Sequence, residues 1–148
     1  MAKIELPDHI LNALSTVLQQ LQQSLPELKQ IPDFSAHAYK WQHGELKPIH
    51  QLRQMELADL KGIERQKEKV IQNTLQFLNG LPANDVLLTG SRGTGKSSIV
   101  RALLTEYADQ GLRLIEIERD DLSDLPQIQQ LIAERPEKFI VYCDDLAF

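Results

Sequence analysis

Residues 90–97 read Gly-Ser-Arg-Gly-Thr-Gly-Lys-Ser and match G-x-x-x-x-G-K-[ST] at every fixed position. In such a loop the backbone N–H groups face a phosphate, the lysine reaches the outer phosphates, and the hydroxyl binds a magnesium ion. Lys96 also begins a predicted helix, whose N-terminal N–H groups attract anions. We therefore predict a phosphate-binding loop with Lys96 as a catalytic residue, Ser97 as a metal ligand, and a cradle of Gly90, Ser91, Arg92, Gly93, Thr94, Gly95, Lys96, Ser97 and Ser98.

Two other interpretations of the glycines are weaker. A simple turn between a strand and a helix would not require five fixed positions. A dinucleotide fingerprint begins at Gly93-Thr94-Gly95, with an acidic residue about 20 positions on, but Ser98 stands where its third glycine belongs. Lys96 and Ser97 have roles beside a triphosphate and none in the dinucleotide pattern. The phosphate-loop interpretation is therefore favoured.

A pair of acids follows the last predicted strand, residues 139–143. An apolar strand that ends in an acid is typical of a Walker B segment. Because parallel strands bring their carboxyl ends to one edge of a sheet, we expect Asp144 to approach Ser97 and hold magnesium through water. Asp145 would then orient or deprotonate the attacking water. A turn or helix cap is the alternative role for Asp145.

The reaction class follows from what surrounds these motifs. Guanine recognition usually shows N-K-x-D, which this sequence lacks, so ATP is favoured over GTP. Two neighbouring acids suit an ATPase better than a small-molecule kinase that shares the same loop. A binding module whose partner affinity changes with its nucleotide state is a further alternative.

The elements that position these residues alternate along the chain. Strands separated by helices predict right-handed crossovers and a parallel sheet covered on both faces. We expect a three-layer α/β fold made of a helix over 62–79, a strand ending at Thr89, a helix over 96–110, a strand over 112–118, a helix beginning at Asp121 or Ser123, and a strand over 139–143.

The N-terminal part differs in character. Residues 8–25 predict a helix with leucines three and four positions apart, at 11, 14, 18, 21 and 25. This stripe suits a dimerising or partner-binding helix, but packing on its own domain is favoured because a coiled coil usually needs three to four heptads. Residues 34–59 show no clear period and are interpreted as a linker. The predicted division is an N-terminal helical segment over 1–33, this linker, and a nucleotide-binding part over 60–148.

Composition limits the number of domains, the partners and the cellular location that the chain can have. The 148 residues suit about one domain, and the net charge of −5 argues against broad nucleic-acid binding. A single cysteine excludes an internal disulfide. There is no visible signal peptide, and no apolar run approaches the ~20 residues that cross a bilayer. We therefore expect a cytoplasmic protein without a membrane partner.

The chain from about residue 35 to its end resembles the bacterial AAA+ type ATPases catalogued as domain of unknown function 815. The resemblance is carried by 83–98 with its R-G-T-G-K-S-S string, by 106–115, by C-D-D-L at 143–146, and by the upstream segments 60–67 and 73–74. It implies an AAA+ type P-loop fold that binds ATP and Mg²⁺, with Gly62 and Ile63 in the segment that lines the adenine pocket. It also implies assembly into a ring of identical copies, but it implies no substrate, and the macromolecular target is unknown.

The sequence departs from the general AAA+ pattern in two ways. Most AAA+ proteins carry Asp-Glu at the end of Walker B, whereas this chain has Asp144-Asp145. AAA+ domains also continue with a fourth and fifth strand, a sensor and an arginine finger, whereas this chain ends at Phe148. We therefore expect a sheet that is incomplete at the C-terminus, with a gap beside the phosphate-loop strand. An arginine finger is worth ~10³–10⁵ in rate, so we expect slow turnover.

Overall fold

The computed structural model describes residues 5–24, 32–91 and 95–146. The chain separates into two compact units, Met1–Ile31 and Pro32–Phe148, and each is described by itself. In the first unit, helix α1 (Asp8–Ser24) confirms the predicted N-terminal helix, and none of its residues is buried. Among the described helices, none has the length and apolar character needed to cross a membrane.

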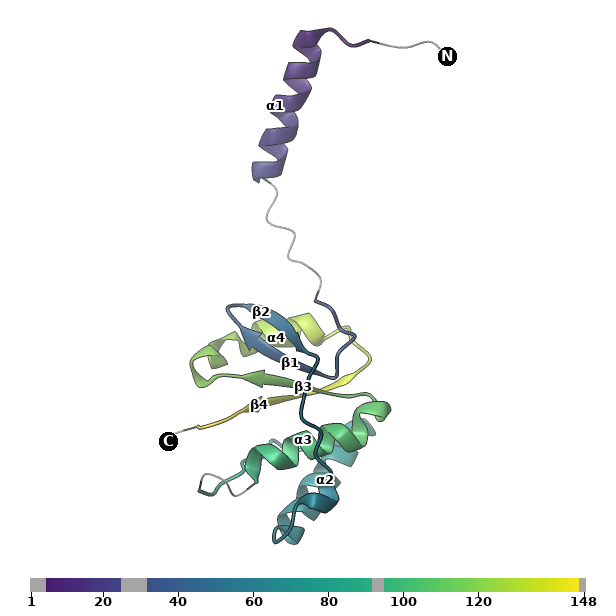
Figure 1. Cartoon of the computed structure of the whole chain (residues 1–148), viewed down its shortest axis with the longest axis vertical. Helices are drawn as coiled ribbons and strands as arrows, with labels where there is room; N and C mark the ends of the chain where they lie inside the picture. The colour runs from purple at the N-terminus through teal and green to yellow at the C-terminus, as the bar shows by residue number, and fades with distance from the viewer. Residues whose placement is uncertain (1–4, 25–31, 92–94, 147–148) are drawn as a thin grey trace. The chain divides into compact units, whose positions relative to one another are not determined.

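The second unit is built on one four-stranded sheet (Figure 1). Its strands are β1 (Ala38–Gln42), β2 (Glu45–Ile49), β3 (Leu112–Ile117) and β4 (Lys138–Cys143), arranged in the order β2-β1-β3-β4. β1 pairs parallel to β3, and β3 pairs parallel to β4 from Leu112↔Lys138 to Ile117↔Cys143. Among the described strand pairs, only the β1–β2 hairpin is antiparallel. The expected parallel α/β sheet is therefore present, with an added antiparallel edge strand.

Helices cover both faces of this sheet. Helices α2 (Glu64–Leu78) and α3 (Lys96–Tyr107) lie on one face, and α4 (Leu125–Ile132) lies on the other (Figure 1). Three short 3₁₀ helices, η1 (Leu57–Asp59), η2 (Ala108–Gln110) and η3 (Arg119–Asp124), complete the helical elements. The three-layer arrangement agrees with the fold class expected from the sequence.

The core is divided by the alternation of side chains along the strands. In β3, Leu112 and Leu114 pack on the α2–α3 face, whereas Ile115 and Ile117 pack on the α4 face. All four side chains are at most 4% exposed, because β3 has a strand on each side and helices on both faces. This near-continuous apolar pattern is what a strand buried on both faces requires.

The segment 34–59 is not an irregular linker, because it contains β1 and β2. Tyr39 and Trp41 are fully buried on the α4 face, and the Trp41 indole Nε1 donates to Asp124 Oδ2 at 2.9 Å. The hairpin turns at His43 and Gly44, both with positive φ (53° and 74°), as a two-residue hairpin turn that follows the sheet twist requires. The strands have five residues each, too short for a clear period, which explains why the sequence interpretation missed them.

The strand expected to end at Thr89 is also absent, since residues 82–91 form no strand. Val86 is 49% exposed and Leu87 is 63% exposed. A strand needs a neighbour to share its backbone hydrogen bonds. β4 pairs only with β3, and none of the described strands lies between β4 and this segment. The expected gap beside the phosphate-loop segment is therefore observed. Without a neighbouring strand, this segment cannot form the backbone hydrogen bonds of a sheet.

Replacing Gly44 with alanine tests the hairpin turn. We expect Gly44→Ala to lower the free energy of unfolding by about 1 kcal/mol, because a Cβ atom is strained at positive φ. The measurement is the urea midpoint of unfolding. His43→Asn is the matched control in the same turn and should cost nothing, since asparagine tolerates the left-handed region. A Gly44→Ala midpoint equal to that of the wild type would contradict this turn geometry.

Candidate phosphate-binding site

The phosphate-loop sequence leads directly into α3. Gly95, the residue before the helix, has a φ of 89°, and its carbonyl accepts a hydrogen bond from the Ile99 N–H at 3.0 Å. Glycine is suited to this left-handed position because it has no Cβ. Ser97 and Ser98 therefore lie in the first turn of α3, where helical N–H groups lack intrahelical partners. Arg92, Gly93 and Thr94 lie outside the described residues.

The Lys96 side chain folds back over the loop. Its ammonium donates hydrogen bonds to the Gly90 carbonyl and, at 3.1 Å, to the Ser91 carbonyl. Both acceptors belong to the predicted cradle, so the positive charge is held at the rim of the loop. An ammonium held by neutral carbonyls can exchange them for phosphate oxygens, which form stronger, charge-assisted hydrogen bonds.

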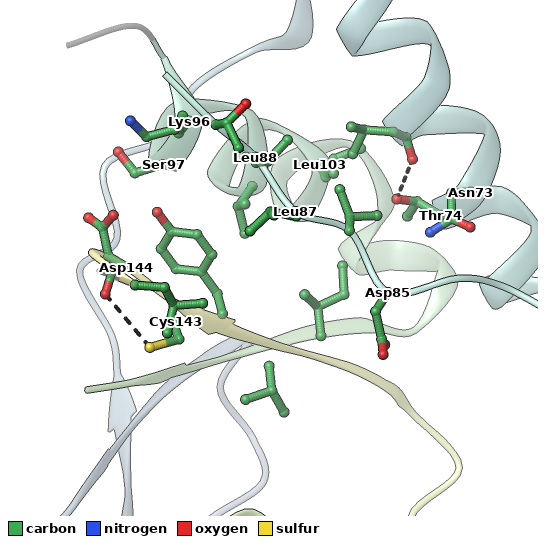
Figure 2. A pocket seen from close by; sticks show the side chains of 18 of the residues that line it. Asn73, Thr74, Asp85, Leu87, Leu88, Lys96, Ser97, Leu103, Cys143 and Asp144 are labelled. Carbon is green, nitrogen blue, oxygen red and sulfur yellow. Dashed lines mark hydrogen bonds between the residues drawn. The ribbon is translucent and has the colours of Figure 1, made fainter. Parts of the chain in front are cut away.

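The predicted metal ligands come from different elements and lie on one edge of the sheet. Figure 2 shows Lys96, Ser97 and Asp144 gathered at the same end of one cavity. Asp144 directly follows β4, and its Oδ1 accepts a hydrogen bond from the Asp145 N–H at 2.9 Å. Ser97 of α3 and Asp144 after β4 thus lie at the same end of the cavity.

Asp145 has an unusual backbone. Its φ is 58°, one of two positive values among the described non-glycine residues. Aspartate and asparagine tolerate this conformation better than most residues, but it is uncommon and recurs at functional sites. The backbone turn after β4 orients Asp145 differently from the residues of the strand, while its N–H holds the Asp144 carboxylate.

The side chains next to these acids are neutral at physiological pH. Burial raises the pKa of Tyr142 to about 12, with further contributions from the Asp144 charge and from a hydrogen bond to Asp144. Burial likewise raises the pKa of the Cys143 thiol, and the charge of Asp144 adds to the effect. Because both groups are uncharged, neither is an anion that could bind a cation in competition with Asp144.

A cavity of about 970 Å³ runs from this polar end along the free edge of β4. One wall is the segment 83–90, and the opposite wall is β4 with the residues that follow it. Leu88, Leu103 and Ile140 give the floor an apolar character away from Lys96 and Asp144. The volume is at the upper end of the ~300–1,000 Å³ typical of ligand sites, and it coincides with the gap in the sheet.

Asn73 of α2 attaches the segment 83–90 to the rest of the fold. Its Nδ2 donates to the Asn84 carbonyl at 2.7 Å, and its Oδ1 accepts from the Asn84 N–H at 2.9 Å. The amide thus pairs with both backbone groups of Asn84, much as a neighbouring strand would. Asn73 is not among the site residues predicted from the sequence, because its side chain acts on a residue eleven positions away and no spacing pattern signals this contact.

Gly62 and Ile63 are not among the residues that line the cavity, but Ile63 lies beside the phosphate loop. Its Cδ1 lies 3.8 Å from the position that a Cβ at Gly95 would occupy, so this side chain is next to the phosphate loop. Gly62 precedes it with a φ of 77°. The residues predicted to line an adenine pocket are therefore adjacent to the predicted phosphate cradle.

Lys67 of α2 has a structural role. The Lys67 ammonium donates to the Leu57 and Leu60 carbonyls at 2.8 and 3.1 Å and pairs with Glu64 at 3.0 Å. It thereby fastens η1 to α2.

Within residues 5–24, 32–91 and 95–146, no group of three or more His, Cys, Asp or Glu residues could hold a metal ion. Mg²⁺ needs only one or two protein carboxylates beside phosphates and water, so a lone Asp144 with Ser97 fits that ion.

The comparisons with known proteins point to one family. The model of a family described as "Protein of unknown function (DUF815)" matches residues 34–148. A region of 84 residues is 29% identical to the replication factor C large subunit of Methanococcus maripaludis. That region covers 57% of this chain and 17% of the relative, so the chain spans a small part of the curated relative that it matches. No solved structure matches the chain.

Replacing Asn73 with alanine tests the attachment of the segment 83–90. We expect Asn73→Ala to speed amide hydrogen exchange over residues 84–90, measured by mass spectrometry, because both hydrogen bonds to Asn84 are lost. The free energy of unfolding should fall by only about 1–2 kcal/mol. Gln72→Ala changes the exposed neighbouring position of α2 and should leave this exchange as in the wild type. Equal exchange in the two variants would show that Asn73 does not hold the segment.

Proposed function

The chain belongs to the DUF815 family, and we propose that it binds MgATP at the loop over residues 90–97 and hydrolyses it slowly. The similarity to the replication factor C large subunit supports a general AAA+ nucleotide-binding module. The observation that carries the more specific proposal is the convergence of Lys96, Ser97 and Asp144 at one end of the cavity (Figure 2).

The phosphate cradle is proposed from the loop and the first turn of α3. Backbone N–H groups of residues 90–97 would face the phosphates, and Lys96 would exchange the Gly90 and Ser91 carbonyls for the outer phosphate oxygens. Ser98 would contribute from the same turn. The N-terminus of the twelve-residue helix α3 adds a favourable dipole for the anion.

The cation site is proposed from two elements. Ser97 would bind Mg²⁺ directly through its hydroxyl, and Asp144 would hold the ion through water. The ion supplies charge neutralisation on the transferred phosphate. The Asp145 N–H fixes the orientation of the Asp144 carboxylate by donating to its Oδ1, so the acid is prepared for this role before nucleotide arrives.

Asp145 is proposed to orient the attacking water or accept its proton. Phosphoryl transfer requires mainly positioning and charge stabilisation, so a correctly placed carboxylate is sufficient for this role. The strained backbone at Asp145 supports a functional role, since such strain persists where the surrounding structure enforces it.

The base is proposed to lie against Gly62 and Ile63. The Ile63 side chain lies on the side of Gly95 that a Cβ atom would face and would offer an apolar surface to an adenine ring. Since the sequence lacks N-K-x-D, we propose ATP rather than GTP as the ligand. Assembly into a ring of identical copies is a further proposal that rests on the AAA+ relationship.

Lys96→Ala tests the phosphate contact. We expect the variant to bind MgATP about 100-fold more weakly or not at all, because charge-assisted hydrogen bonds to phosphate are lost. Isothermal titration of the intact protein measures this. Lys69→Ala removes an exposed lysine of α2 and should leave the affinity unchanged. An unchanged affinity in Lys96→Ala, with a wild-type circular dichroism spectrum, would refute the assignment.

Asp145→Asn tests the role of the second acid. Asparagine keeps tolerance of positive φ, so the variant should fold and bind MgATP normally. We expect turnover to fall by about 100-fold or more, as for loss of a general base. The measurement is phosphate release without any added acceptor, which also separates an ATPase from a small-molecule kinase. Turnover equal to that of the wild type would assign Asp145 to the turn alone.

A further inference from the structure

We propose that α1 is a self-association helix whose apolar face packs against α1 of other copies of this chain. The proposal concerns the first unit alone and does not rest on the proposed nucleotide chemistry. It begins from six large apolar side chains of α1 that are 38–59% exposed, namely Ile10, Leu11, Leu14, Val17, Leu18 and Leu21.

These side chains form one continuous stripe. At 100° per residue they fall within an arc of roughly 120°, and the opposite face carries polar residues, chiefly Asn12, Thr16, Gln19 and Gln23. In proteins an amphipathic helix gains most of its stability from packing of its apolar face. The stripe therefore needs a partner, and helices of the same kind present a matching surface.

The charge of α1 decides which partner fits. Asp8 is its only acidic residue, and the helix contains no lysine or arginine. Two copies can therefore approach without repulsion between like charges. A helix that binds a membrane surface usually carries lysine or arginine on its polar face, and a helix that reads a charged partner needs complementary charge. An almost uncharged amphipathic helix fits its own copy best.

The width of the stripe indicates the kind of assembly. Leu11, Leu14, Leu18 and Leu21 follow the three-four spacing of a two-stranded seam, and Ile10 and Val17 widen that seam on one side. A face of three apolar positions in seven is typical of helices in a bundle, whereas a two-stranded coil uses two in seven. The stripe is shorter than a coiled coil usually needs. Ile10 and Val17 compensate for this length, because a helix in a bundle buries more of its surface than a helix in a two-stranded coil.

The experiment compares three full-length proteins by light scattering after size exclusion, over a series of concentrations. We expect the wild type to have a mass of two or more chains that falls on dilution. Leu18→Asp places a charge in the stripe and should raise the dissociation constant at least about tenfold. Gln19→Asp adds the same charge one residue away, on the polar face, and should keep the wild-type mass.

Three results would overturn the proposal. They are a wild-type chain that is monomeric at the highest concentration reached, a mass that Leu18→Asp and Gln19→Asp lower equally, or a mass that neither variant lowers. The last result would place self-association elsewhere in the chain. Because Leu18→Asp can also weaken the helix itself, Leu18→Ala provides a second test, since alanine favours helix while removing apolar contact. It should raise the dissociation constant with helicity kept, and MgATP titration of the same samples reports separately on the nucleotide site.

Discussion

The parallel pairing of β3 with β4 is the constraint on which the candidate site depends. It brings the carboxyl end of β4 to the same edge of the sheet as the start of α3, so Asp144 and Ser97 line the same end of the cavity although they are far apart in the sequence. β3 itself is held by a strand on each side and by helices on both faces. The rigid centre of the fold thus supports a site that lies on its edge.

The loop is attached to this centre in an unusual way. A phosphate loop commonly follows a strand of the sheet, but here the preceding segment 83–90 has no strand partner among the described residues. Asn73 makes two hydrogen bonds to the backbone of Asn84, which replace some of the bonds that a neighbouring strand would make. At the other end of the segment, Lys96 donates a hydrogen bond to the Gly90 carbonyl. The segment is therefore fixed near its two ends, and the cavity beside β4 lies between them.

The two units carry exposed apolar surface of different kinds. In α1 it is a regular stripe on a helix without lysine or arginine, which suits packing against identical helices. In the second unit Val86, Leu87, Val141 and Leu146 are exposed around the free edge of β4, where an unpaired strand also offers backbone groups. The first surface favours helix packing and the second favours strand pairing, because backbone groups are satisfied within a helix but not at a sheet edge.

The sequence by itself determined the elements with strong local signals. The apolar runs of β3 and β4, the periodicity of α1, and the helices over 62–79 and 96–110 could all be recognised without coordinates. Tertiary structure decided the rest. Whether Val86–Leu88 forms a strand depends on a neighbouring strand, which no local pattern encodes, and β1 and β2 are strands because β3 and α4 bury Tyr39 and Trp41. The contact of Asn73 with Asn84 depends on how α2 packs, since hydrogen bonds between distant residues follow from packing and not from spacing.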